Sequence, residues 1–377
     1  MSASFGFLSS FPPTQCGLAT FTAALQAEIA AAGSETGVVR VLERPAPFTR
    51  PTVVQHMVHG QPGAVEGSAA ALNAFDVVVV QHEYGIYDGV DGDSVVDVLD
   101  LLRVPSIVVL HTVLVEPTRH QREVLEAVGR QASALVTMTA AAHQRLIDHY
   151  DVDDAKVVVI PHGAAGRYDG RPHRLDASGP RMLTWGLLGP GKGIERVIDA
   201  LPSLRDLVPR PHYLVVGETH PRVLERDGDA YRDWLIARAR RLGVADMVTF
   251  EAGYLDVDAL SSLAASADVV ILPYDSREQV TSGVLIEAVT ARRPVIATRF
   301  AHAVELLGSG AGIVVDHDDP LALGAAIRLV LCEPAQAASM AKQAAALAPD
   351  LLWPAVAARY RMLAADLVTA DASAALA

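Results

Sequence analysis

The sequence predicts an α/β protein built from two doubly wound parallel-sheet domains, and three observations predict this fold class. Continuous apolar runs of strand length, at residues 77–80 and 268–272, fit strands covered on both faces better than half-exposed strands. These runs alternate along the chain with helical patterns, as in an α/β fold. At 377 residues, the chain is too long for one ordinary core and suits two domains.

The expected elements follow in chain order. Strands of the first domain are expected at residues 5–8, 38–42, 53–58, 77–80, 106–110, 134–138 and 157–160, with helices near 18–32, 117–131 and from 140. A segment rich in Gly, Pro, Arg and Asp, residues 164–180, is the predicted linker. Strands of the second domain are expected at residues 181–186, 212–216, 248–250 and 268–272 and before 298, and a last helix at 353–367. We therefore assign residues 1–170 and 171–349 to the two domains.

Composition excludes several classes of protein. A net charge of −13 argues against a nucleic-acid partner, because the phosphate backbone would repel the chain. Cys16 and Cys332 lie far apart and make no metal-ligand spacing, so we expect a reducing cytoplasm. There is no basic start and no run of about 18 apolar residues, so neither secretion nor a membrane span is expected. Peripheral membrane contact and the oligomeric state stay open.

The stretch of residues 268–298 predicts an anion site. Its strand should end at Pro273, and Thr281 or Ser282 can cap the helix that follows. Gly283 has no Cβ to keep a ligand from the first N–H groups, those of Ser282 to Val284. Glu287 lies five residues beyond Ser282, which is about 7 to 8 Å along a helix. This is the distance at which the ribose of a bound nucleoside diphosphate would lie from its diphosphate. The alternative is that Glu287 is a solvated helix residue.

This stretch resembles the donor-site motif of retaining GT-B glycosyltransferases of family 4. Gln279 occupies the first acidic position of the family motif, and Glu287 fills the second. In the family the first residue holds hydroxyls of the donor sugar. An amide can still hydrogen-bond them, but it carries no charge. Glu278, one position away, is a weaker candidate for the same role.

Two glycine-containing loops also resemble the family. Gly186, Leu187 and Lys192 correspond to a Gly-Arg-Leu loop and a Lys-Gly pair, whose Arg and Lys bind the donor diphosphate. Lys192 matches, whereas Leu187 stands where the arginine usually is, so one charge is missing unless Arg277 supplies it. The loop around Gly17 resembles the glycine-rich loop of the first domain only loosely. By resemblance, Gly217 and two residues that border the nucleobase complete the donor site, the latter being Tyr254 and Leu255.

Polar residues follow two strands of the first domain. The cluster after residue 80 has the polar and aromatic groups that suit polyol recognition, namely Gln81, His82, Glu83 and Tyr84. The alternative is an internally bonded loop network. His111 ends the next strand, and the family places a histidine in this position near the transferred sugar. We therefore treat His111, Lys192 and Gln279 as the catalytic candidates.

The resemblance implies two Rossmann-like domains that face each other across a cleft, with residues 350–377 returning to the first domain. It also implies retaining, metal-independent hexosyl transfer from a GDP- or UDP-sugar to a small-molecule or glycan hydroxyl, with no cofactor. A nucleotide-sugar 2-epimerase of the same architecture and a non-catalytic sugar or nucleotide binder remain as alternatives. The acceptor, the nucleobase and the sugar are not predicted by any pattern in the sequence.

Overall fold

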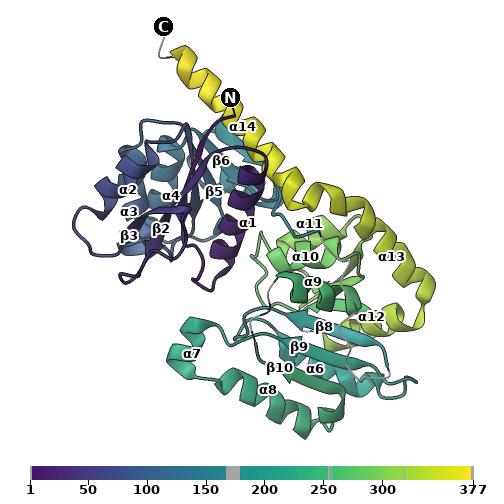
Figure 1. The fold of residues 1–377 in the computed structure, drawn as a ribbon. Coiled ribbons are helices and arrows are strands. Elements are labelled where there is room, and N and C mark those ends of the chain that lie inside the picture. The colour runs from purple at the N-terminus through teal and green to yellow at the C-terminus, as the bar shows by residue number, and fades with distance from the viewer. Residues whose placement is uncertain (1, 167–178, 254, 256, 318, 375–377) are drawn as a thin grey trace. The chain divides into compact units, whose positions relative to one another are not determined.

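The structure is a computed structural model that describes residues 2–166, 179–253, 255, 257–317 and 319–374. The chain divides into two compact units, Met1–Gly163 with Trp353–Ala377, and Ala164–Leu352. The sequence interpretation placed the division after residue 170 and the return at residue 350. Each unit contains its own sheet and is described by itself (Figure 1).

The first unit is organised around a seven-stranded parallel sheet in the order β3-β2-β1-β4-β5-β6-β7. Its strands are β1 (Phe5–Ser9), β2 (Thr36–Leu42), β3 (Val53–Val58), β4 (Val77–His82), β5 (Ser106–Leu110), β6 (Ala134–Thr137) and β7 (Val157–Val159). Four of them, β1, β4, β5 and β6, are buried along their whole length, as continuous apolar runs predict for a sheet covered on both faces. The predicted parallel sheet is confirmed.

Helices connect these strands. They are α1 (Gly17–Ala31), α2 (Ala64–Leu72), α3 (Ser94–Asp100), α4 (Arg119–Gln131) and α5 (Ala140–His149), with short 3₁₀ turns η1 (Val90–Gly92) and η2 (Asp154–Lys156). A capping box between Thr118 and Gln121 starts α4. The last helix, α14 (Trp353–Ala374), packs against α1 and shares a core with Phe21 and Leu25 (Figure 1). The C-terminal segment therefore completes the first unit.

The second unit has a six-stranded parallel sheet in the order β10-β9-β8-β11-β12-β13. Its strands are β8 (Arg181–Trp185), β9 (His212–Val216), β10 (Val248–Glu251), β11 (Val269–Leu272), β12 (Val295–Thr298) and β13 (Gly312–Val315). Its helices are α6 (Ile194–Ala200), α7 (Pro221–Asp227), α8 (Ala230–Arg241), α9 (Val257–Ser266), α10 (Gly283–Thr290), α11 (Ala301–Leu307), α12 (Pro320–Cys332) and α13 (Pro334–Leu347), with η3 (Leu201–Leu204), η4 (Ala245–Met247) and η5 (Ala348–Leu351).

Alternate residues of these strands enter two separate cores. Met182 and Val269 pack with α6, α8 and α12, whereas Leu183 and Val270 pack with α9, α10 and α11. The sheet is therefore covered on both faces, which confirms the doubly wound architecture.

Each sheet has a switch point beside its first strand. In the first unit the chain moves outward from β1 to β3 and then returns to β4 on the other side of β1. In the second unit it does the same from β8 to β10 and returns to β11. In open α/β sheets, ligands bind at the carboxyl ends of the strands at such a point. The β1/β4 and β8/β11 strand ends are therefore the places to look for a site.

Within the described ranges, no single helix has both the length and the apolar character needed to cross a membrane. One bent pair, Pro320–Cys332 with Pro334–Leu351, meets the length and composition test only when its two members are joined across a 94° bend.

The attachment of α14 can be tested at Gly163. A Cβ built on Gly163 would lie 2.3 Å from the ring of Trp353, which is buried in the core of the first unit. Gly163→Ala should therefore destabilise this unit by about 1 to 3 kcal/mol, the usual cost of overpacking, and lower its Tm by several degrees. Gly17→Ala is the control, because a Cβ there meets no atom within 4 Å. Equal Tm values for the two variants in a thermal melt would contradict this packing.

Candidate functional site

The loop after β8 brings Lys192 to the switch point of the second sheet. Gly193, at φ 64°, follows Lys192, and a Cβ there would lie 1.8 Å from the carbonyl oxygen of Pro273. Only glycine tolerates both the backbone conformation and this approach to the end of β11. The Asp275 N–H also donates to the Gly191 carbonyl at 3.0 Å. These contacts fix the β8–α6 loop against the residues that follow β11.

Lys192 is a partly buried cation. Its Nζ lies 4.9 Å from the centroid of the Tyr274 ring, within the range of a cation–π contact. Burial lowers the pKa of the Lys192 ammonium from its ordinary value. Among the residues that the structure describes, no carboxylate forms an ion pair with it. Its positive charge is therefore available to an anion.

The tip of α10 lies beside the same tyrosine. Ser282 is the N-cap of α10, and its side chain accepts a hydrogen bond from the Leu285 N–H at 3.2 Å. Burial raises the pKa of the Tyr274 hydroxyl, and the neighbouring Ser282 side chain opposes that rise. The structure thus brings Lys192 and Ser282 together on one residue. The sequence patterns did not identify Tyr274, although its place directly after the strand-ending Pro273 was a usable signal.

One detail of the predicted anion site is wrong. The Ser282 N–H does not point to an open site, because it donates to Nδ1 of His302 at 2.9 Å. The next two N–H groups, those of Gly283 and Val284, have no acceptor within the described part of the chain. They precede the first intrahelical bond, as in any helix start, and carry the positive end of the helix dipole. Among the described residues, the site therefore has two N–H donors without acceptors rather than three.

Glu287 is not a solvated helix residue. It is partly buried, and its Oε2 accepts a hydrogen bond from the Trp185 indole N–H at 3.0 Å. Burial raises the pKa of Glu287 to about 7, and the hydrogen bond from Trp185 opposes that rise. Trp185 is the last residue of β8, so the carboxyl is held at the switch point of the sheet. The sequence interpretation missed Trp185.

The glycines of the predicted donor site are tightly placed. Gly186, at φ 122°, has the Val284 side chain 3.8 Å from where its Cβ would be. A Cβ on Gly217, at φ 147°, would lie 1.9 Å from the Gly186 carbonyl oxygen. Leu187 is partly buried and supplies no charge. Arg277 is exposed and its charge contributes to lowering the pKa of Asp316, the residue that follows β13.

The structure gives contacts for two of the three remaining donor-site candidates. The Gln279 Nε2 donates to the Thr281 carbonyl at 3.0 Å, so its amide helps to hold the loop before α10. Leu255 is partly buried and packs against the hydrophobic core. Tyr254 lies outside the described residues.

In the first unit, Gln81 and His82 are buried inside a strand. The sequence analysis placed them in a loop after residue 80, but β4 continues to His82, and both side chains are at most 1% exposed. Pairing with β5, which also runs to Leu110, extends the strand by two residues. The loop assignment was therefore wrong for these two residues, which are the last two residues of β4 and are buried.

His111 follows β5 and lies next to Gln81. The distance from His111 Nε2 to Gln81 Oε1 is 2.7 Å, and because an amide oxygen only accepts, Nε2 carries the hydrogen. Burial, together with the charges of His162 and His82, lowers the pKa of His111 to about 3. His111 is therefore a neutral imidazole at pH 7. It can hydrogen-bond a sugar but cannot supply a positive charge.

An aromatic cluster holds this histidine. The Phe21 ring meets the rings of His111, His162 and Trp353 edge-on, at centroid distances of 5.0, 5.0 and 4.9 Å. No sequence pattern linked these four residues, because they come from α1, two loops and α14. Gly17, at the start of α1, has open space where a Cβ would be.

Glu83 and Tyr84 are engaged by the protein itself. Glu83 Oε2 accepts a hydrogen bond of 2.5 Å from the Thr112 hydroxyl, and the Tyr84 hydroxyl donates to the Gln121 carbonyl at 3.4 Å. The Tyr84 ring also meets His82 edge-on. For these two residues the structure supports the alternative of an internally bonded loop network.

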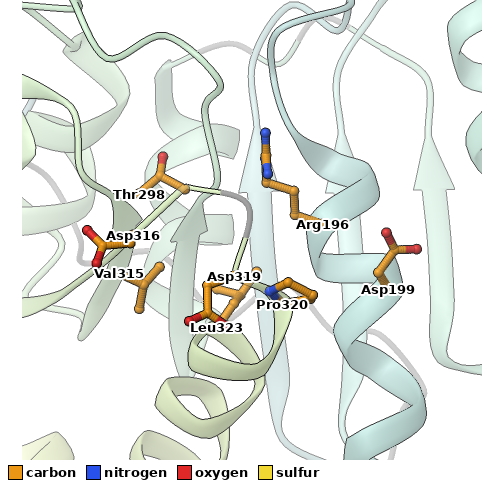
Figure 2. Close-up of a pocket in the computed structure, with 8 residues that line it drawn as sticks. All are labelled: Arg196, Asp199, Thr298, Val315, Asp316, Asp319, Pro320 and Leu323. Atoms are coloured by element: carbon orange, nitrogen blue, oxygen red, sulfur yellow. The ribbon is translucent and has the colours of Figure 1, made fainter.

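A cavity of about 210 Å³ lies elsewhere in the second unit (Figure 2). Figure 2 shows two side chains of α6 on one side of the cavity, and residues at the ends of β12 and β13 and at the start of α12 on the other. The lining residues are Arg196, Asp199, Thr298, Val315, Asp316, Asp319, Pro320 and Leu323. Asp199 pairs with Arg238, Asp316 pairs with Arg299, and Asp319 caps α12. Arg196 pairs with Asp275. The lining is acidic and its charges are matched, so it is unsuited to a diphosphate.

The raised pKa of Glu287 makes a prediction about stability. The carboxyl titrates near 4.5 when unfolded and near 7 when folded, so its protonated form stabilises the fold below about 4.5 and this contribution is lost as pH rises through 7. Glu287→Gln cannot ionise, so its Tm relative to wild type should rise between pH 5 and pH 8. Glu225→Gln, at an exposed position of α7, controls for the loss of a carboxylate. A Tm difference for Glu287→Gln that does not change with pH would contradict the burial of this carboxyl.

Known proteins resemble this chain in sequence and in fold. Residues 170–347 match the family model described as glycosyl transferases group 1. A D-inositol 3-phosphate glycosyltransferase of Kineococcus radiotolerans is 29% identical over 257 residues, which cover 63% of this chain and 57% of that protein. A GDP-mannose-dependent alpha-(1-6)-phosphatidylinositol monomannoside mannosyltransferase of Mycolicibacterium smegmatis is 28% identical over 233 residues, 58% of each chain. The chain thus spans less than three fifths of these relatives.

Solved structures agree over nearly the whole chain. The Anabaena protein HepE in complex with UDP has a TM-score of 0.78 at 17% identity, over 97% of this chain and 100% of that one. A sucrose-phosphate synthase from Thermosynechococcus elongatus has a TM-score of 0.79 at 19% identity with the same coverage. At such low identity these likenesses establish the fold. The chain has the GT-B fold, and its match to the group 1 glycosyltransferases lies on the unit that holds Lys192 and Glu287.

Proposed function

We propose that this protein is a retaining glycosyltransferase that moves a hexose from a nucleoside diphosphate sugar to a hydroxyl of a small-molecule or glycan acceptor. The observation that carries the proposal is the meeting of Lys192 and Ser282 on Tyr274, at the switch point of the second sheet. The relatives support it, since one is named for GDP-mannose and the HepE structure contains UDP. The proposed donor is a GDP- or UDP-sugar.

The diphosphate is the part of the donor that these groups suit. Lys192 supplies a whole positive charge without a neighbouring carboxylate, and the Gly283 and Val284 N–H groups supply the positive end of a helix dipole. Glu287, five residues beyond Ser282, is placed to accept hydrogen bonds from the ribose hydroxyls through oxygen atoms held near the end of β8 by Trp185. Ionised Glu287 is the better acceptor, and hydroxyl donors bound to it would favour that form.

The same groups would accelerate the reaction. The bond between the anomeric carbon and the β-phosphate oxygen breaks, and negative charge accumulates on the departing diphosphate. Positive groups fixed in place before the reaction stabilise this charge without reorganisation, which is commonly the largest contribution to catalysis. The family resemblance implies that the departing phosphate accepts the acceptor's proton, so we assign no general base. The proposal uses no metal ion and no cofactor.

The first unit is the proposed acceptor side. His111 offers a neutral imidazole whose tautomer is set by Gln81, so it can hydrogen-bond a hydroxyl of the transferred sugar. Gln279, in the second unit, is proposed to bind donor hydroxyls as an uncharged group, without electrostatic stabilisation of a cationic sugar. We place the reaction in the cytoplasm, where Cys16 and Cys332 would remain the free thiols that they are in the structure.

Lys192→Ala tests the proposal. Loss of one such electrostatic donor typically lowers turnover 10²- to 10³-fold, so we expect kcat to fall at least fiftyfold with an unchanged Tm. Lys342→Ala, an exposed lysine of α13 in the same unit, is the matched control and should retain wild-type kcat. The measurement is release of nucleoside diphosphate with GDP- and UDP-sugars over an acceptor panel.

Two results would contradict the proposal. Near-normal turnover of Lys192→Ala would remove the diphosphate role. Donor consumption by the wild-type protein that needs no acceptor and yields an altered sugar would instead identify an epimerase.

A further inference from the structure

A row of polar side chains crosses three strands of the first sheet at their carboxyl ends. Arg40 on β2 stands opposite Ser9 of β1 on one side and His56 of β3 on the other. Neighbouring residues in register point to the same face of a parallel sheet. The row therefore presents a cation, an imidazole and a hydroxyl side by side, in a unit whose proposed acceptor residues lie on other strands.

Arg40 is a buried cation that no described carboxylate neutralises. It is 5% exposed, and within the described residues its side chain makes one hydrogen bond, from Nη2 to the Thr14 hydroxyl at 2.9 Å. Its Nε is fully covered and has no acceptor within the described ranges. Burial lowers the pKa of this guanidinium. Arginine is rarely buried unless it is paired, because an isolated charge is costly to remove from water.

His56 is a second donor that lacks a partner. The Phe48 ring lies on the His56 ring at a centroid distance of 3.9 Å and an interplanar angle of 6°. The covered Nε2 of His56 meets no acceptor in the described part of the chain. Burial and the charge of Arg40 lower the pKa of His56, so the imidazole is neutral at pH 7. A neutral imidazole can still donate one hydrogen bond to an anion beside Arg40.

The surroundings also favour negative charge. Thr14, which accepts the bond from Arg40, is two residues before Cys16, the N-cap of the 15-residue helix α1. No acidic residue stands in the first turn of α1. The β2–β3 connection carries exposed Arg44 and Arg50 against one exposed carboxylate, Glu43, in a chain with a net charge of −13. A local excess of positive groups in an acidic protein indicates an anionic ligand.

We propose that Arg40, assisted by His56 and Thr14, binds the anionic group of a small-molecule ligand, a phosphate monoester or a carboxylate, at the carboxyl ends of β1, β2 and β3. Binding gives an acceptor to the Arg40 Nε–H, which has none among the described residues. The identification of this ligand as the acceptor of glycosyl transfer rests on the proposed function. The anion site itself does not depend on that function. The acceptor is accordingly a charged molecule rather than a neutral glycan.

The test is thermal unfolding with inorganic phosphate, with acetate as the carboxylate probe and sodium chloride at matched ionic strength. Phosphate or acetate at about a hundred times its Kd should raise the wild-type Tm by about 5 °C or more. Arg40→Met should abolish that rise. Its Tm without anion should equal or exceed that of wild type, because the substitution removes an unpaired buried charge. Phosphate acting alone would select a phosphate monoester, and acetate acting alone a carboxylate.

One control separates this site from other positive groups. Arg50→Met removes an exposed arginine of the same connection and should keep the wild-type rise in Tm. Arg40→Lys serves if the methionine variant does not fold, and it should bind phosphate at least tenfold more weakly than wild type by calorimetry.

Two outcomes would overturn the anion site: no rise in Tm with either anion in the wild type, or an unchanged rise in the Arg40 variants. None of these measurements needs a donor sugar. If the wild-type protein showed no glycosyl transfer, the proposed function would be rejected, but the evidence for the anion site would be unaffected.

Discussion

The second unit depends on an ammonium group that no carboxylate among the described residues neutralises. Lys192 is partly buried above the Tyr274 ring, and burial alone lowers its pKa. A charge held in this way is stabilised only weakly by the protein, since a cation–π contact contributes about 0.5 to 2 kcal/mol. Most of its potential interaction energy therefore remains available to an anionic ligand. The surrounding loop is built to keep it there, through Gly193 against the end of β11.

The same principle connects the other unusual groups. Glu287 is kept near the end of β8 at the cost of a raised pKa, with one hydrogen bond from Trp185. Arg40 is buried with a single hydroxyl as its acceptor. In both units these groups lie near the carboxyl ends of parallel strands. Perturbed titratable groups cluster at functional sites, because the protein gives up stability there for interactions that the ligand completes.

The sequence predicted those parts of the fold and site that depend on local pattern. Apolar runs predicted two parallel sheets, and Ser282 before Gly283 marked the start of α10. Local sequence patterns could not predict contacts between residues far apart in the chain. Trp185 and Glu287, for example, form a hydrogen bond although they are 102 positions apart. The end of β4 was predicted two residues too early. Gln81 and His82 are polar, but they continue the strand because they pair with β5. The hydrogen bond from the Ser282 N–H to His302 depends on tertiary packing and has no signature in the sequence.

The central claim is that the second unit binds a diphosphate, and calorimetry on the wild-type protein tests it most directly. Guanosine, GMP and GDP, and the matching uridine series, would be titrated at constant ionic strength. The β-phosphate is the group expected to reach Lys192 and the α10 tip. For the base that binds, we therefore expect the diphosphate to bind at least tenfold more tightly than the monophosphate, a difference of about 1.4 kcal/mol. Equal affinities for the monophosphate and the diphosphate in both series would contradict the account.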